Sequence, residues 1–216
     1  PETRGRIKGE LDEPEENGLE FDLTTIMISS IPEGPNKKFE GQMLTAIAEQ
    51  KGMTPVEAAL DLLANESGGI QMITFSMDEA DVRQVMRHPA VAVASDGWTL
   101  SPESGGRPHP RSYGTYVRVL GKYVREEKVL RLEDAVRKMS SLPAQRLGRY
   151  DLGLIRPGCV ADLVVFDPDK VGDRSTFQNP HQYAAGVHHV IVNGQLVIEN
   201  ETDTGAVAGK VLRRGR

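Results

Sequence analysis

The sequence contains few of the residues that cross-link a chain or anchor it in a membrane. Its 216 residues include one cysteine, which excludes a disulfide framework. No apolar run reaches the 18 residues of a membrane span, and no charged-then-apolar leader precedes the first apolar segment. Aromatic residues make up 5%, which argues against a stacking platform for nucleic acid. We therefore expect a soluble, cytoplasmic protein without a membrane partner.

Metal-ligand motifs are scarce as well. The five histidines include no HxH or HExxH spacing, and Cys159 lies in a Gly-Cys-Val-Ala turn. There is no glycine-rich phosphate loop and no Ser-His-Asp elbow. The sequence therefore predicts no complete metal site within this chain.

The start of the chain is polar and lacks an initiator methionine. Residues 1–22 combine Pro14, Gly18 and a dense acidic run, which predicts a loop or a disordered terminus. We expect the sequence to be a piece of a longer protein.

Charge is unevenly distributed along the chain, whose formal net charge is -5. Residues 1–96 contain 18 acidic and 8 basic side chains, whereas residues 107–149 contain 11 basic and 4 acidic ones. A basic segment can bind nucleic acid. However, its apolar residues recur at helical intervals, which favours a solvated helical face packed beside an acidic neighbour. We adopt the second interpretation and expect no nucleic-acid partner.

Up to about residue 100, apolar runs typical of buried strands alternate with helical patterns. Strands are expected at Thr24–Ser30, Ile70–Phe75 and Val91–Ser95. A first helix is expected at about 42–50. Two more helices each follow a capping box: one spans 54–65 after Thr54-x-x-Glu57, and the other runs from Ser76-x-x-Glu79 to just before Pro89. This alternation predicts an α/β fold with a parallel sheet. Beyond Gly148 the pattern changes: residues 162–167 and 187–200, the latter folded about Asn193-Gly194, predict a small antiparallel β unit.

Candidate functional residues follow the ends of the predicted strands, where the loops of parallel α/β sheets open. Asp96 follows the strand Val91–Ser95, and a carboxylate there suits a metal, a cation or a proton-transfer partner, although Asp before Gly is also ordinary turn chemistry. Arg111 closes the next loop and suits capture of a substrate carboxylate, but it can equally be a surface arginine. Met77 is most simply a packing residue, and His109 between two prolines is weak evidence for any role.

Taken in order, several segments resemble the C-terminal half of the N-acyl-D-amino-acid deacylases (D-aminoacylases), a branch of the metal-dependent amidohydrolase superfamily. They are IMISS at 26–30, MITFSMDEADV at 72–82, RHPAVAVASDG at 87–97, HPRSYGTYVRVLGKYVRE at 109–126, RLEDAVRKMSSLPAQRLG at 131–148, the long stretch 156–197, and GAVAGKVLRR at 205–214. The most specific element is Ser-Asp-Gly after a strand, joined to His-Pro-Arg-x-x-Gly.

The resemblance implies an architecture in two parts. Residues 23–150 would contribute the last strands and helices of a (β/α)8 barrel, with a helical insert at about 40–66. Residues 151–216 would contribute the C-terminal strands of a small β-sandwich domain. The partners it implies are an N-acyl amino acid as substrate and the N-terminal part of the same enzyme.

The resemblance also implies roles for four residues. Asp96 would be the catalytic carboxylate, a general base and then acid, and could face a second metal. Arg111 would hold the α-carboxylate of the substrate, Met77 would line the pocket for its side chain, and Ser30 would contact it. The cofactor implied is zinc, whose other ligands would lie upstream of Pro1, so the chain alone is expected neither to hold catalytic zinc nor to turn over substrate. The Ser- and Gly-rich insertion Pro102–Gly106 departs from the family pattern, and so does Ala94 in place of glycine.

Two other functions stay open at this point. The first is a cyclic amidohydrolase resembling dihydroorotase or hydantoinase. The second is a non-catalytic chain, either truncated or one half of a split protein, that binds a partner through exposed sheet edges.

Overall fold

A computed structural model describes residues 2–12 and 22–214 of the chain. They have a mixed α/β fold that divides into two compact units. Unit 1 comprises Pro1–Met77, Ser101–His109 and Thr176–His181, and unit 2 comprises Asp78–Leu100, Pro110–Ser175 and Gln182–Arg216. No helix in the described part of the chain is long and apolar enough to cross a membrane.

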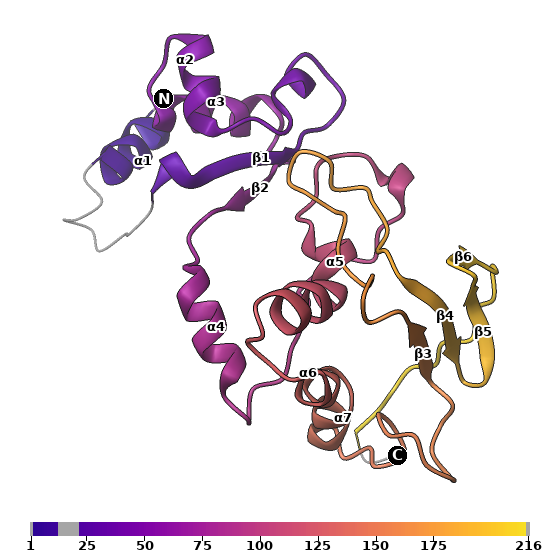
Figure 1. The fold of residues 1–216 in the computed structure, drawn as a ribbon. Coiled ribbons are helices and arrows are strands. Elements are labelled where there is room, and N and C mark those ends of the chain that lie inside the picture. The colour runs from indigo at the N-terminus through magenta and orange to yellow at the C-terminus, as the bar shows by residue number, and fades with distance from the viewer. Residues whose placement is uncertain (1, 13–21, 215–216) are drawn as a thin grey trace. The chain divides into compact units, whose positions relative to one another are not determined.

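Unit 1 consists of two paired strands with helices packed against them (Figure 1). Its elements are α1 (Glu2–Asp12), the 3-10 turn η1 (Leu23–Thr25), β1 (Ile26–Ser30), the 3-10 turn η2 (Lys37–Phe39), α2 (Leu44–Lys51), α3 (Pro55–Asn65), β2 (Gln71–Thr74) and the 3-10 turn η3 (Pro102–Ser104). The core joins Ile26 and Ile28 of β1 to Ile47 of α2 and Leu62 of α3, all at most 5% exposed. The helices predicted over 42–50 and 54–65 are confirmed.

Local sequence signals explain where these two helices begin and end. Gly52 ends α2 in the left-handed conformation, with φ of 65°, which glycine adopts without a steric penalty. At the start of α3, the Thr54 hydroxyl accepts a hydrogen bond from the Glu57 amide, and the Glu57 carboxylate accepts one from the Thr54 amide. This reciprocal pair is the predicted capping box, and Pro55 occupies the first helical position.

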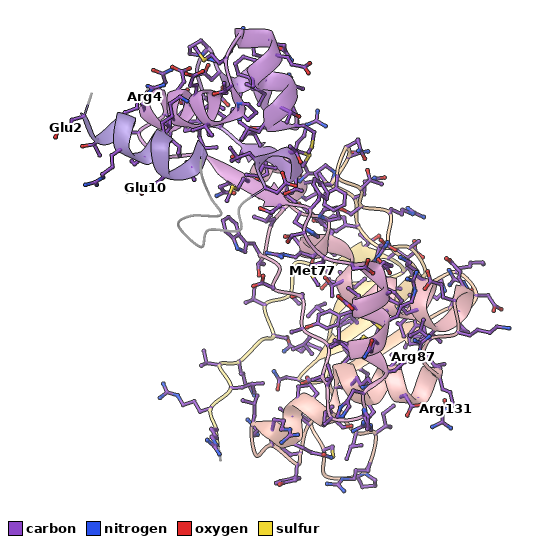
Figure 2. The ribbon with its side chains drawn as sticks, turned by 90° about the vertical axis from the view of Figure 1, so that its left-hand side faces the viewer. Glu2, Arg4, Glu10, Met77, Arg87 and Arg131 are labelled. Atoms are coloured by element: carbon purple, nitrogen blue, oxygen red, sulfur yellow. The ribbon has the colours of Figure 1, made fainter. Side chains whose placement is uncertain are left out.

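The first residues of the chain contradict the predicted loop. Residues 2–12 form α1, which places Arg4 near α3, where its guanidinium donates to the Glu57 carbonyl at 3.4 Å (Figure 2). An ion pair between Arg6 and Glu10, one helical turn apart, further supports the helix. The acidic composition was therefore outweighed by docking on α3. The remainder of the predicted loop, residues 13–21, lies outside the described residues.

The pairing of β1 and β2 is antiparallel, not parallel as predicted. β1 is buried along four of its five residues, as a strand covered on both faces should be, whereas β2 buries Ile73 and leaves Gln71, Met72 and Thr74 exposed. Parallel strands occur almost only where both faces of the sheet are covered. The exposed β2 does not meet that condition.

Unit 2 combines five helical segments with a four-stranded antiparallel sheet (Figure 1). Its elements are α4 (Glu79–Arg87), α5 (Arg111–Arg118), the π-helical segment η4 (Val119–Glu126), α6 (Leu132–Met139), α7 (Ser141–Arg146), β3 (Leu163–Phe166), β4 (Val187–Val192), β5 (Gln195–Glu199) and β6 (Thr202–Asp203). The core gathers Val119, Leu120 and Tyr123 of η4, Ala135 of α6, and Val171.

The C-terminal β unit confirms its sequence signal. β4 and β5 form the hairpin predicted at Asn193-Gly194, where both turn residues have positive φ, 49° and 79°. β3 pairs with the other edge of β4, so the sheet order is β3-β4-β5-β6.

Two predictions about unit 2 are wrong. The strand expected at Val91–Ser95 is absent, because no strand in the described ranges pairs with it. The capping box expected at Ser76 is absent too: Asp78 caps α4, accepting from the Ala80 amide at 2.6 Å, because it stands directly before the first helical residue.

Candidate active site

Asp96 lies in an exposed turn between the segment Val91–Ser95 and the loop that leads to α5. Its backbone is left-handed, with φ of 47°, a conformation that Asp tolerates better than most residues. The Ser95 hydroxyl accepts a hydrogen bond from the Gly97 amide at 3.2 Å and closes the turn around Asp96. The carboxylate is 85% exposed, so it is accessible to a substrate or to another part of the protein.

Gly97 lets this turn approach the start of α5 closely. A Cβ atom at this position would lie 2.9 Å from the Arg111 carbonyl oxygen and 2.9 Å from the Ser112 Cα. The contact is held by a hydrogen bond from the Trp98 amide to the Ser112 hydroxyl at 3.2 Å. Fourteen residues apart in sequence, Trp98 and Ser112 thereby fix the turn of Asp96 against the first turn of α5.

Asp96 and Arg111 form an ion pair with Oδ2 to Nη2 at 2.9 Å. The Arg111 side chain is 43% exposed, so water screens the pair and its net contribution to stability is small, about 0–1 kcal/mol. Such a pair can open at low cost. The site therefore offers an accessible carboxylate and an accessible guanidinium side by side, and the roles expected for the two residues stay predictions.

Ser30 and Met77, the other two predicted site residues, belong to unit 1. Ser30 ends β1 and is partly exposed. A Cβ on Gly106 would lie 3.3 Å from the Ser30 Oγ, and the Arg107 amide donates to the Ser29 carbonyl at 2.6 Å. The Ser- and Gly-rich insertion singled out in the sequence therefore packs beside Ser30.

Met77 is 83% exposed, in the link between β2 and α4 (Figure 2). It is not a packing residue in this structure, because a core methionine would be buried. An exposed, flexible thioether is suited to contact with a ligand or with another chain segment. Its position leaves the predicted role as a pocket wall a hypothesis.

Unit 1 also contains polar and aromatic groups that sequence reasoning missed. Phe177 makes edge-to-face contacts with Phe75, at 4.8 Å between ring centroids, and with His109, at 5.0 Å. The His181 Nε2 and the Gly106 carbonyl oxygen are 2.9 Å apart. Both Phe177 and His181 come from the segment Thr176–His181, about 100 residues from Phe75, and no local motif marks them.

The described residues do not fit a metal ion. Among residues 2–12 and 22–214, no group of three His, Cys, Asp or Glu side chains could hold one. Asp96 instead faces the Arg111 guanidinium, and the Cys159 sulfur accepts from Arg156 at 3.3 Å.

The basic segment 107–149 is matched by carboxylates, as predicted. Its ion pairs join Arg118 to Asp173, Lys122 to Glu79, Arg125 to Glu126, Arg131 to Asp134 and Arg149 to Asp151, at N to O distances of 2.6–3.1 Å. Burial favours the neutral form of Glu79, but hydrogen bonds from Lys122 Nζ and the Tyr123 hydroxyl outweigh it and hold its pKa below the ordinary value. These cations are engaged in folding contacts within the chain.

Comparison with known proteins identifies relatives with longer chains. An N-acyl-D-glutamate deacylase of Alcaligenes xylosoxydans xylosoxydans is 42% identical over 180 residues, which are 83% of this chain and 35% of the relative. A crystal structure of a D-aminoacylase matches 88% of this chain and 38% of its own, with a TM-score of 0.77 and 39% identity. An N-acyl-D-glutamate deacylase from Bordetella bronchiseptica, solved with zinc and a phosphonate inhibitor, matches 90% of this chain and 43% of its own, with a TM-score of 0.71 and 34% identity.

The chain spans about a third of the length of the curated relatives it matches. Residues 36–198 match the model of the family described as the amidohydrolase family. That match includes parts of both units and contains Asp96 and Arg111. The chain therefore belongs to the amidohydrolase family.

Proposed function

We propose that this chain is the C-terminal part of a metal-dependent hydrolase that acts on non-peptide C–N amide bonds. The reaction is the deacylation of an N-acyl-D-amino acid to a D-amino acid and a carboxylate. The observation that carries the proposal is the accessible Asp96–Arg111 pair, in a family whose similar members include N-acyl-D-glutamate deacylase and D-aminoacylase. A carboxylate can transfer a proton in this reaction, and a guanidinium can bind the carboxylate at the amino-acid end of the substrate.

Asp96 is the proton-transfer group in this proposal. Its carboxylate can accept a proton from the attacking water as a C–O bond forms at the amide carbonyl. The protonated Asp96 then delivers that proton to the departing nitrogen as the C–N bond breaks. One water is consumed, and the carboxylate is regenerated in its original state.

Arg111 is the substrate-binding group. Its exposed ion pair with Asp96 is weak enough to be exchanged for the α-carboxylate of the substrate, which a guanidinium can bind through two parallel hydrogen bonds. The exchange leaves Asp96 close to the amide on the same Cα. Binding of the carboxylate also fixes which face of Cα is turned toward Asp96. We propose this as the basis for selection of the D form.

Ser30 and Met77 are proposed as further substrate contacts. Support comes from the partial exposure of Ser30 at the end of β1 and from the 83% exposure of Met77. The loop Pro102–Gly106 beside Ser30 would then contribute to the choice of substrate side chain.

Zinc is the proposed cofactor, supported by the zinc in the Bordetella bronchiseptica deacylase structure. In this proposal its main ligands lie in the N-terminal part of the enzyme, and Asp96 has at most the role of ligand to a second metal. Residues 23–150 are proposed to complete a (β/α)8 barrel, with a helical insert at about 40–66, and residues 151–216 a composite β-sandwich. This would give the segment Val91–Ser95 the neighbouring strand that it lacks.

The test is Asp96→Asn in the complete protein, assayed with N-acetyl-D-glutamate, N-acetyl-D-leucine and their L forms. Asn is preferred to Ala because it also tolerates the left-handed backbone at this position. We expect kcat to fall about 10²- to 10⁴-fold, the usual worth of a general acid-base group. The matched control is Asp169→Asn, which neutralises an exposed aspartate in the turn after β3.

Activity of the Asp96→Asn protein within tenfold of the parent would exclude Asp96 as the proton-transfer group. A parent that hydrolyses hydantoin or dihydroorotate, and no N-acyl-D-amino acid, would replace the proposal by a cyclic amidohydrolase. A parent inactive on all of these would favour a non-catalytic role.

A further inference from the structure

Lys138 is a buried lysine in the last turn of α6. Its side chain is 2% exposed, and the described residues place no carboxylate within ion-pair distance of its ammonium. Burial, together with the adjacent Arg137 charge, holds its pKa below the ordinary value. A buried cation is costly unless its hydrogen bonds are satisfied, so its partners should indicate why a lysine is present.

The partners of Lys138 all lie in one short segment. Its Nζ donates to the carbonyl oxygens of His88 and, at 2.9 Å, of Val91. Its own carbonyl accepts from the Val93 amide at 3.1 Å. The neighbouring Arg137 donates to the Pro89 carbonyl at 2.6 Å. The end of α6 therefore holds residues 88–93 by four hydrogen bonds to main-chain atoms.

Besides these bonds to α6, the segment is held by the packing of Val93 against the core of unit 2. His88 caps the C-terminus of α4, where carbonyl groups lack helical partners and a cation is favourable. Beyond it, Val91–Ser95 pairs with no strand within the described ranges. An apolar side chain at position 138 could fill the same space, but the Val91 carbonyl would lose its Lys138 donor and the His88 carbonyl would keep only its bond from the Val91 amide.

The anchored segment leads directly to the candidate catalytic carboxylate. Asp96 follows Val93 by three residues, and the opposite side of its turn is held by the Trp98–Ser112 hydrogen bond. The turn of Asp96 is thus fixed from both sides, by α6 before it and by α5 after it. Arg111 belongs to α5, and none of the four hydrogen bonds from α6 is directed to that helix.

We infer that Lys138 is a positioning residue for the proposed deacylation: it anchors the segment His88–Val93 on α6 and thereby holds Asp96 opposite Arg111. The inference rests on the proposed function of Asp96. In this inference Lys138 affects proton transfer by Asp96 and does not affect binding of the substrate carboxylate by Arg111.

The test is Lys138→Met in the complete protein, since methionine retains the apolar stem and removes the donors. Displacement of a catalytic group by about 1 Å can cost up to 10²-fold, so we expect kcat to fall about 10- to 100-fold. KM should stay within threefold, because Arg111 is held by α5. The matched control is Lys210→Met, which removes an exposed lysine and should leave both parameters unchanged. The inference would be overturned if KM rose by the same factor by which kcat fell, or if kcat did not fall.

A second measurement does not depend on activity. Hydrogen exchange of peptides covering residues 91–97 should accelerate at least tenfold in Lys138→Met and stay at the parental rate in Lys210→Met. If Lys138→Met does not fold, Arg137→Met is the second variant, because it removes only the bond to Pro89. In that variant kcat should fall at least threefold, and hydrogen exchange of residues 91–97 should accelerate at least threefold. Parental exchange in the folded variant overturns the anchor. An inactive parent with accelerated exchange overturns only the proposed function.

Discussion

Replacing Gly97 by alanine tests whether the close approach between the Asp96 turn and α5 sets the geometry of the site. The added methyl group would lie 2.9 Å from both the Arg111 carbonyl oxygen and the Ser112 Cα. These are backbone atoms of a helix, so no side-chain rotation relieves the contact. The turn and the first residues of α5 must separate.

The expected size follows from two opposing effects. Forcing a methyl group into a packed contact costs about 1–3 kcal/mol. Removing a glycine from the unfolded chain returns about 0.4–1 kcal/mol. The net loss of local stability therefore lies between about 0 and 2.6 kcal/mol, and its midpoint of about 1.3 kcal/mol corresponds to a roughly tenfold increase in the population of the open turn. The same displacement separates Asp96 from Arg111, so kcat should fall by about one to two orders of magnitude.

The assay is hydrogen exchange of the complete protein, read from peptides that cover residues 95–98 and 111–115, together with deacylase kinetics. The control is Gly209→Ala, because a Cβ at that position has no heavy atom within 4 Å. Exchange and kcat of Gly97→Ala that match those of Gly209→Ala would show that the approach of the two backbones is not required. The reasoning from packing at this turn would then be wrong.

The remaining predictions concern the helices. Glu79→Gln removes a carboxylate whose pKa is lowered by Lys122 and Tyr123, so the stability it provides is present above about pH 4.3 and is lost as pH falls through its folded pKa. The difference in melting temperature between Glu79→Gln and the parent should thus shrink from pH 7 to pH 3.5, and a constant difference would contradict this reading. Thr54→Ala breaks the capping box with Glu57 and should cost about 1 kcal/mol in hydrogen exchange of the first turn of α3, whereas Thr54→Ser should cost less than half of that. Equal losses for the two variants would refute the cap.

Elements with a local cause could be predicted from the sequence. The Thr54 capping box, the Gly52 helix end and the Asn193-Gly194 turn each depend on residues within four positions of one another, and the structure confirms all three. The burial of Ile26–Ser29 was likewise readable from an unbroken apolar run.

Elements that depend on a distant partner could not be predicted. Val91–Ser95 has the composition of a strand, but a strand also requires a neighbour, and α6 supplies the contacts instead. The direction of β2 depended on which faces of the sheet were covered. The sequence pattern of Gln71–Thr74 does not indicate which faces of the strand are covered.

The candidate site shows the same division. Asp96 and Arg111 were chosen by their place after a predicted strand and its loop. The strand is absent, but the structure brings the two side chains within 2.9 Å of each other, and their roles stay predictions. Phe177 and Lys138 carry no motif, because each acts on a segment about 45 to 100 residues away. Such residues are visible only once the fold is known.

The hydrogen bonds from α6 to residues 88–93 end on main-chain atoms, and every amino acid carries the same carbonyl group. Lys138 therefore requires nothing of the side chains at the positions it holds, and these positions can change over evolution without a compensating change in α6. Correlated substitutions, from which contacts are often inferred across an alignment, would leave this contact undetected. Hydrogen bonds to main-chain atoms can be retained while the residues at these positions are substituted.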